Sequence, residues 1–289
     1  MTGPTFVHAN GVDLALWERP GTEPTILFCH ATGFHARCWD QVIARVPDRR
    51  CLAIDMRGHG RSSKPALPYR WRYFGEDLSE VVRAIGLSGA LAVGHSMGGH
   101  AAVLAAANVP EAFAGLLLLD PVLLTRGYYS DDPRPEHFAR KRRNTWASWQ
   151  EMFERFRERP PFVQWDPAVL RDYCEFGLLP VPDGNGLVLA CPPEVEASVY
   201  EHTSETDADI YAEASRVDVP VEVIRSARQM GREPTPLDMG ASPTAPDLAT
   251  HFKRGRDLKT EYSHFLPMEA PEFVAERIVS FANAHLART

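Results

Sequence analysis

The sequence predicts an α/β fold: a mostly parallel, doubly wound sheet with helices on both faces, and an inserted, mainly helical lid. Three observations support this prediction. Short, nearly continuous apolar runs recur in the first 123 residues and again after residue 212, and each ends in turn residues, as strands buried on both faces do. Segments with helical periodicity separate these runs. Between about residues 124 and 212 this alternation stops, and aromatic and arginine residues become frequent.

The strands are expected in the following order. The stretch FVHANGVDLALWE predicts a β-hairpin that turns at Asn10-Gly11. Four buried strands are expected next, in the runs TILFCHA, CLAIDMRG, ALAVGHS and AGLLLLDPV. Two more are expected near the C-terminus, in PVEVIRSA and DLKTEYS.

Helices are expected between these strands. The stretch CWDQVIARV fits one helix, and apolar residues spaced from Phe74 to Ile85 predict a second that stops at Gly86. Met97 to Asn108 predicts a third helix, and PEFVAERIVSFANAHL predicts the last. This β-α-β alternation is typical of a parallel sheet covered on both faces.

The stretch in which the alternation of strands and helices stops defines the expected domain organisation. We expect residues 1–123 and 213–289 to form one core, with residues 124–212 inserted as a lid. Within the lid, LLPVPDGNGLVLAC predicts a small hairpin. The run Arg140 to Arg143 is expected to form a solvated helix face, with attraction of a substrate carboxylate as the alternative.

Composition excludes several classes of protein. The formal net charge of −7 over 289 residues argues against a nucleic-acid-binding protein. No basic and apolar leader precedes the first strand, and no apolar run approaches the roughly 18 residues of a membrane span, so we expect a cytoplasmic protein that does not act at a membrane. The five cysteines contain no CxxC pair and are expected to be reduced. No metal or cofactor site is visible, and we expect none.

The stretch AVGHSMGGHAAV carries the clearest chemical signal. A serine hydroxyl needs a base to accept its proton and donors to stabilise the resulting oxyanion. The pattern Gly94-His-Ser96-Met-Gly98, between a strand and a helix, holds a serine on a tight turn that small neighbours permit. The first helical N–H, that of Met97, would face the developing negative charge. Ser96 is therefore the candidate nucleophile.

The candidate general base is His264. It follows the last expected strand in the stretch YSHFLPMEAPE, directly before the C-terminal helix. Histidine changes protonation state near neutral pH, which suits it to proton transfer. His30, His59, His95 and His100 occur in turns of other motifs and are expected to have structural roles.

Four stretches together resemble the α/β-hydrolase fold family, in its lidded branch: LFCHATGFHARCW, AIDMRGHGRSSKP, AVGHSMGGHAA and SHFLPMEAPE. The resemblance implies serine-hydrolase machinery and a second oxyanion donor in the turn after the first parallel strand. Relatives usually have His-Gly-x there, whereas this chain has His30-Ala31-Thr32. By this resemblance the backbone N–H of Thr32 would join that of Met97.

The acid that should orient the histidine is missing from its usual place. In most members of the family an aspartate follows the penultimate strand, and here that position falls on about Gln229. Asp120 occupies the alternative position that some members use, and Asp238 and Asp247 are the other candidates. We predict Asp120, because an acid at a strand end is positioned by the rigid sheet, whereas a loop must be ordered by something else.

These residues predict a serine esterase or lactonase. Ser96, His264 and Asp120 would form the triad and Met97 and Thr32 the oxyanion hole, with hydrolysis through an acyl-enzyme. The substrate would be a small ester or lactone, apolar or aromatic because of the aromatic lid. Epoxide hydrolases and dehalogenases resemble this family but use a carboxylate nucleophile, which the serine argues against. Two alternatives stay open: a carbon–carbon bond hydrolase of aromatic degradation, and a ligand receptor that retains the triad.

Overall fold

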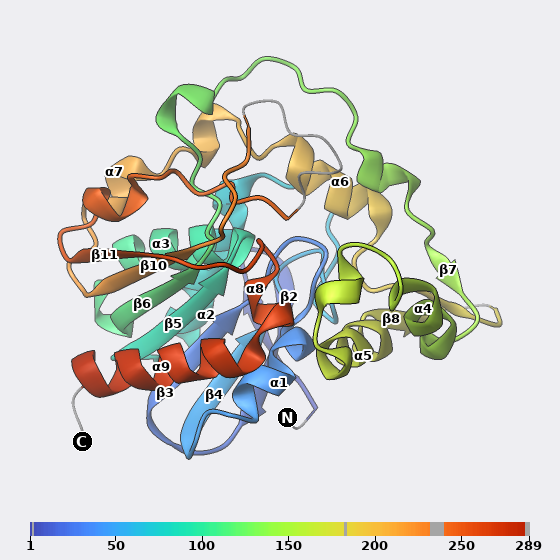
Figure 1. Ribbon diagram of the computed structural model, residues 1–289, viewed down its shortest axis with the longest axis horizontal. Helices are drawn as coiled ribbons and strands as arrows, with labels where there is room; N and C mark the ends of the chain where they lie inside the picture. The colour runs from blue at the N-terminus through green and yellow to red at the C-terminus, as the bar shows by residue number, and fades with distance from the viewer. Residues whose placement is uncertain (2, 182–183, 232–239, 287–289) are drawn as a thin grey trace.

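One eight-stranded sheet forms the centre of the molecule (Figure 1), in the order β1-β2-β4-β3-β5-β6-β10-β11. The computed structural model describes residues 1, 3–181, 184–231 and 240–286. The sheet strands are β1 (Thr5–Ala9), β2 (Val12–Arg19), β3 (Thr22–Cys29), β4 (Arg49–Ile54), β5 (Ala90–His95), β6 (Phe113–Leu119), β10 (Val221–Arg225) and β11 (Gly255–Lys259).

The sheet is mostly parallel. Strands β1 and β2 form the predicted antiparallel hairpin, and β2 pairs antiparallel with β4. Asn10 and Gly11 both have positive φ, 46° and 74°, as a two-residue hairpin turn requires. All pairings from β4 across to β11 are parallel. The last strand lies slightly earlier in the chain than the predicted DLKTEYS run.

Helices cover both faces of the sheet, as predicted. Alternate residues of β3 point to opposite sides: Leu27 packs with α2 (Trp71–Ala84) and α3 (Met97–Asn108), whereas Phe28 packs with α1 (Asp40–Ile43) and α9 (Pro271–His285). Figure 1 shows α9 crossing the sheet on the side of α1. The single helix expected for CWDQVIARV is a 3-10 turn, η1 (Ala36–Trp39), followed by the single turn of α1.

The chain between β6 and β10 contains a second, smaller sheet in the order β7-β9-β8. Its strands are β7 (Thr145–Trp146), β8 (Leu178–Pro180) and β9 (Leu187–Leu189), and β8 and β9 form the predicted hairpin. The α-helices of this segment are α4 (Trp149–Phe156), α5 (Pro167–Phe176), α6 (Pro193–Glu201) and α7 (Tyr211–Ala214). In Figure 1, α4, α5, β7 and β8 gather beside the main sheet.

Short helices complete the described chain. The remaining α-helix is α8 (Leu266–Glu269), which leads into α9. The remaining 3-10 helices are η2 (Pro110–Ala112), η3 (Arg126–Tyr128), η4 (Phe138–Lys141), η5 (Phe162–Gln164), η6 (Thr206–Ala208) and η8 (Leu248–His251).

The solvated helix face expected for Arg140 to Arg143 is confirmed only in part: Lys141 and Arg143 are exposed, whereas Arg140 and Arg142 are partly buried. The chain leaves η4 at Lys141, and Arg142 adopts an extended backbone with φ −62° and ψ 141°. The Arg142 side chain is largely buried and forms an ion pair with Glu196 of α6. A buried carboxylate on a distant helix, which local sequence does not reveal, draws this guanidinium inward.

Candidate active site

Parallel strands bring several chain segments together at one edge of the sheet, where the carboxyl ends of β3, β5, β6 and β10 meet. His95 at the end of β5 pairs in register with Leu119 at the end of β6. The next residues, Ser96 and Asp120, therefore leave adjacent strands at the same level.

Ser96 occupies a strained turn between β5 and α3. Its φ of 54° and ψ of −117° lie outside the regions that most residues adopt. The turn is tightly packed: a Cβ placed on Gly94 would lie 2.6 Å from the carbonyl oxygen of Gly98, and one on Gly98 would overlap the backbone of Cys29. Glycine is thus needed on both sides of the serine, as the sequence pattern predicts.

His264 connects Ser96 to Asp120. Ser96 Oγ lies 3.0 Å from His264 Nε2, and His264 Nδ1 lies 2.6 Å from Asp120 Oδ2. An ionised carboxylate only accepts hydrogen bonds, so Nδ1–H donates to Asp120 and Nε2 is left to accept from the serine hydroxyl. The backbone N–H of His264 donates to Gly240 O at 2.8 Å, which fixes the loop that carries the imidazole.

Asp120 is completely buried and held on both oxygens. Oδ2 faces His264, and Oδ1 accepts hydrogen bonds from Ser226 N (3.0 Å), Ser242 Oγ (2.5 Å) and Thr244 Oγ1 (3.2 Å). Burial alone would raise the pKa of Asp120. The hydrogen bond and charge of His264, helped by Ser242 and Ser226, outweigh this effect and lower the pKa below its usual value. The carboxylate is therefore ionised at neutral pH.

Gln229, at the position where the family resemblance leads us to expect the acid, supports Asp120 indirectly. Its side-chain amide donates to the carbonyl oxygens of Ser242 and Thr244, both at 2.9 Å. Met230 N–H also donates to Ser242 O at 2.7 Å. The glutamine thus holds in place the short segment whose two hydroxyls bind Asp120.

The other two acid candidates have different outcomes. Asp238 lies outside the described residues. Asp247 is exposed, and its carboxylate lies 3.4 Å from Nε2 of His251. Of the candidates that the structure describes, Asp120 contacts His264.

The two backbone N–H groups of the predicted oxyanion hole are free to donate a hydrogen bond to a substrate. Met97 is the first residue of α3, so its N–H has no acceptor within the helix. Thr32 lies in the turn after β3, where the amides of the next two residues are used: Gly33 N donates to His59 Nε2 and Phe34 N to Ala31 O. Within the described parts of the chain, the Thr32 amide has no acceptor.

The neighbouring histidines hold the loops of the site. His95 Nε2 donates to the carbonyl oxygen of His264 at 2.8 Å. Burial, reinforced by the nearby His264, lowers the pKa of His95 to about 3, so this imidazole is neutral. His30 Nε2 accepts from Met56 N at 3.0 Å, which joins the turn after β3 to the turn after β4. These contacts agree with the structural roles expected for these residues.

A cavity of about 520 Å³ lies beside the candidate site, and Thr32 is the candidate residue that lines it. Thr32, Gly240 and Phe265 form its wall nearest the candidate machinery. Most of the remaining wall comes from the segment between β6 and β10, which contributes many aromatic side chains, including Trp146, Phe162 and Trp165. Volume and lining are typical of a site for a small organic molecule.

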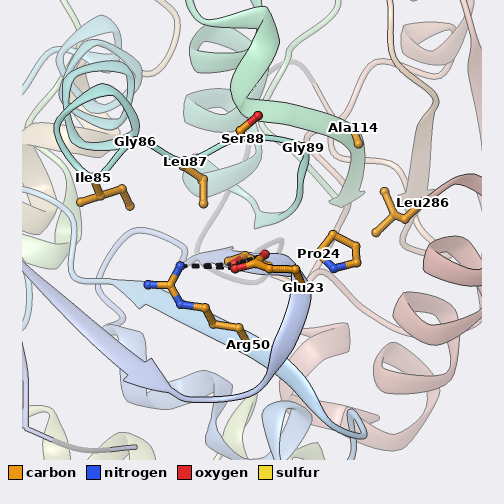
Figure 2. Close-up of a pocket in the computed structure, with 11 residues that line it drawn as sticks. Glu23, Pro24, Arg50, Ile85, Gly86, Leu87, Ser88, Gly89, Ala114 and Leu286 are labelled. Carbon is orange, nitrogen blue, oxygen red and sulfur yellow. Dashed lines mark hydrogen bonds and ion pairs between the residues drawn. The ribbon is translucent and has the colours of Figure 1, made fainter. Parts of the chain in front are cut away.

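A second hollow, of about 440 Å³, lies at the opposite end of the sheet (Figure 2). It is lined by residues near the starts of β3, β4, β5 and β6, with Arg50 and Glu23 3.6 Å apart within it. Figure 2 shows this pair facing the apolar side chains of Ile85 and Leu87. None of the candidate catalytic residues lines it.

The described residues contain no group of three or more histidine, cysteine or acidic side chains arranged to hold a metal ion. None of the helices in that part of the chain combines the length and apolarity needed to cross a bilayer. All five cysteines lie in the described ranges, and all are buried and free.

Sequence comparison relates the chain to known hydrolases over part of its length. The 2-(acetamidomethylene)succinate hydrolase of Mesorhizobium japonicum is 32% identical over 101 residues, which cover 35% of this chain and 36% of that protein. An epoxide hydrolase of Caballeronia sordidicola is 34% identical over 125 residues (42% and 38%). An esterase of Mycobacterium tuberculosis is 32% identical over 122 residues (39% and 38%). The chain thus spans well under half the length of these curated relatives.

Structural comparison extends over nearly the whole chain. The crystal structure of E-2-(acetamidomethylene)succinate hydrolase superposes with a TM-score of 0.74 and 20% identity, over 97% of this chain and 98% of that one. An enol-lactonase from Burkholderia xenovorans gives a TM-score of 0.68 and 21% identity, over 96% and 100%. At these identities the likeness establishes the fold.

The sequence profile described as the alpha/beta hydrolase fold matches residues 24–164, which include Thr32, Ser96, Met97 and Asp120. Together with the parallel sheet, the turn at Ser96 and the structural matches, this identifies the fold. The chain has the α/β-hydrolase fold.

Proposed function

We propose that this protein is a serine hydrolase that cleaves a carboxylic ester or lactone through an acyl-enzyme intermediate. The observation that carries the proposal is the continuous hydrogen-bonded series from Ser96 Oγ through the imidazole of His264 to the carboxylate of Asp120. Each member has the atom its role requires facing the next member.

In the acylation step, Ser96 Oγ attacks the carbonyl carbon while its proton passes to His264 Nε2. The carbonyl oxygen becomes an oxyanion, which the N–H groups of Met97 and Thr32 would stabilise. The intermediate then collapses, the bond to the leaving alcohol breaks, and His264 returns the proton to that alcohol. Asp120 keeps the imidazole in the correct tautomer and stabilises its transient positive charge.

Deacylation repeats these steps with water. His264 accepts a proton from a water molecule, whose oxygen attacks the acyl carbon, and Ser96 leaves with the proton from the imidazole. The products are a carboxylic acid and free enzyme. Every step uses groups of the chain itself, and none requires a cofactor.

Residues 124–212 act in this proposal as a lid that forms the substrate cavity. The side chains of Trp146, Phe162 and Trp165 belong to this segment and line the cavity beside Thr32. Phe34 and Phe265 of the core pack into the same aromatic cluster, with Phe34 stacked on Trp165 at a centroid distance of 5.6 Å. An apolar or aromatic part of the substrate would bind here.

The relatives include an esterase and an enol-lactonase, which support ester or lactone cleavage, and an epoxide hydrolase, which represents a different chemistry. Ser96 favours acyl transfer, because opening an epoxide through a covalent ester intermediate requires a carboxylate nucleophile.

The test is hydrolysis of a panel of p-nitrophenyl esters of increasing acyl length and of lactones, by wild type and Ser96→Ala. The proposal predicts hydrolysis by wild type and its loss in the variant. A wild-type enzyme that cleaves vinylogous diketone acids but no ester or lactone would instead indicate the carbon–carbon bond hydrolase.

A further inference from the structure

The cavity beside the candidate site carries an excess of positive charge within a wall rich in aromatic side chains. Among the residues that the structure describes, four arginines line it (Arg142, Arg143, Arg155 and Arg159), but only one acidic side chain does, that of Glu196. This local excess contrasts with the net charge of −7 for the whole chain.

Two of the four arginines are neutralised by the protein. Arg142 forms an ion pair with Glu196 and donates to Tyr173 Oη at 2.9 Å. Arg143 Nη2 lies 2.6 Å from Glu151 Oε1, and its guanidinium stacks 4.1 Å from the ring centroid of Trp146. These groups have protein partners and build the wall.

The other two have no such partner. Within the described residues, the side chains of Arg155 and Arg159 form neither a hydrogen bond nor an ion pair, although the charge of Arg155 helps to lower the pKa of Glu151, and both arginines are exposed at the cavity. Arg155 is in the last turn of α4, and Arg159 follows two residues after the helix cap. The backbone at Arg159 is fixed from both sides, because its N–H donates to Phe156 O (2.8 Å) and its carbonyl accepts from Val163 N (3.0 Å).

Three further polar groups of the wall have no hydrogen-bond partner in the part of the chain that the structure describes. The indole N–H groups of Trp146 and Trp165 and the hydroxyl of Thr32 are buried and have no partner among the described residues. Unpaired donors and cations raise the electrostatic potential of the cavity, and a planar guanidinium matches the geometry of a carboxylate. The one lining carboxylate, Glu196, is already bound to Arg142.

We infer that the substrate is an anionic ester or lactone: it carries a carboxylate, which Arg159 and Arg155 bind at the cavity mouth while the scissile carbonyl lies at Thr32 and Ser96. The inference rests on the proposed function and adds the class of substrate to it. The aromatic wall holds the body of the substrate, and the two guanidiniums select its charged end.

The experiment compares substrates that differ in charge. These are 3- and 4-acetoxybenzoate and their methyl esters, which share the acetyl group that Ser96 would take up. Cleavage of the acetyl ester releases the corresponding hydroxybenzoate or its methyl ester, and both products are quantified by chromatography. In low-salt buffer we expect wild type to have a higher kcat/KM for at least one acid than for its methyl ester, and added salt to reduce the ratio.

Substitutions of Arg155 and Arg159 test whether these two arginines cause the preference for the charged substrate. Arg159→Gln and Arg155→Gln should each lower the ratio by about fivefold, mainly through KM, as expected for a partly exposed ion pair. Arg157→Gln is the matched control. Arg157 is exposed at the same helix end, but it pairs with Glu154 and Glu158 and does not line the cavity. Its removal should leave the ratio unchanged.

The outcomes separate this inference from the function on which it rests. If the methyl esters are cleaved as well as the acids, and Ser96→Ala abolishes both reactions, the carboxylate site is refuted and the serine hydrolase stands. If Ser96→Ala retains both reactions, the proposed function and this inference fail together.

If acetyl transfer is too slow to measure, the rate at which a fluorophosphonate labels Ser96 is compared in the presence of a charged and an uncharged ligand. In wild type, benzoate should slow the labelling more than methyl benzoate does. In Arg159→Gln, the two compounds should slow it to the same extent. Equal protection by the two compounds in wild type would overturn the inference.

Discussion

Asp120 Oδ2 lies 2.6 Å from His264 Nδ1, although the two residues are 144 positions apart in the chain. The sheet produces this contact. Asp120 follows β6, the neighbour of the strand that carries Ser96, and its own N–H donates to Ile224 O of β10 at 2.7 Å. The acid is thus attached to two adjacent strands and needs no ordered loop to place it.

Replacement of Asp120 tests its role in orienting the base. Asp120→Asn retains the size of the side chain but removes its charge, so the imidazole loses the partner that fixes its tautomer. We expect kcat for ester hydrolysis to fall by about 10³- to 10⁴-fold. Asp247→Asn is the control, because Asp247 is exposed and faces His251. Equal activity of Asp120→Asn and wild type would refute the assignment of the acid.

Gln229 should affect catalysis through Asp120. Gln229→Met retains the side-chain length but removes both hydrogen bonds to the carbonyl oxygens of Ser242 and Thr244. With these hydroxyls less firmly held, the pKa of Asp120 rises. We expect kcat to fall by about tenfold with little change in KM, and the acid limb of the kcat–pH profile to move to higher pH. A loss of thermal stability with unchanged kcat and pH profile would show that the glutamine has a structural role alone.

Close packing behind the serine turn makes a strong prediction about Gly98. A methyl group there would overlap the backbone of Cys29, directly before the turn that carries Thr32. Gly98→Ala should therefore lower the free energy of unfolding by about 1–3 kcal/mol and reduce activity in the protein that still folds. Gly127→Ala is the matched control, because no atom lies within 4 Å of the added Cβ. Denaturant unfolding and ester hydrolysis measure both effects.

Buried histidines should make the fold sensitive to acid. Burial lowers the pKa of His95 to about 3 and that of His100 to about 4. In the unfolded chain these groups bind protons near pH 6.5, whereas in the folded chain they stay neutral to much lower pH. Their stabilisation is complete above about pH 6.5 and is lost as the pH falls towards 4. Together, these two histidines should lower the free energy of unfolding by up to about 3 kcal/mol for each unit by which the pH falls in this range.

Urea unfolding at pH 7.5, 6 and 5 measures this slope. His100→Gln keeps a donor for Ala208 O, which His100 Nε2 contacts at 3.0 Å, but removes the titrating group. The variant should flatten the slope by about 1.4 kcal/mol per pH unit. A free energy of unfolding independent of pH across this range would contradict the account.

Much of the fold could be predicted because its signals are local. The apolar runs of the parallel strands and the helix from Met97 to Asn108 depend on periodicity and on short turn motifs. The turn at Ser96 follows from glycines beside the serine, since larger residues do not fit there. Asp120 and His264 could be chosen because both follow strands that end at the same edge of the sheet.

The remainder depends on contacts between distant segments. Nothing near Gln229 in the sequence indicates that its amide binds a segment 13 to 15 residues away, which in turn binds Asp120. The ion pair of Arg142 with Glu196 joins residues 54 positions apart, so the local sequence does not reveal that this arginine turns inward. The sequence also does not reveal that Arg155 and Arg159 form no ion pair with another described residue, because this depends on which acidic residues surround them in the folded protein.

The central claim is that Ser96 is a nucleophile activated by His264. The most direct measurement is the mass of the intact protein after reaction with a fluorophosphonate, followed by mapping of the modified peptide. We predict one adduct, on Ser96, which is absent in Ser96→Ala and forms far more slowly in His264→Ala and Asp120→Asn. Wild-type protein that stays unmodified, or that is modified at another residue while Ser96→Ala retains ester hydrolysis, would contradict the account.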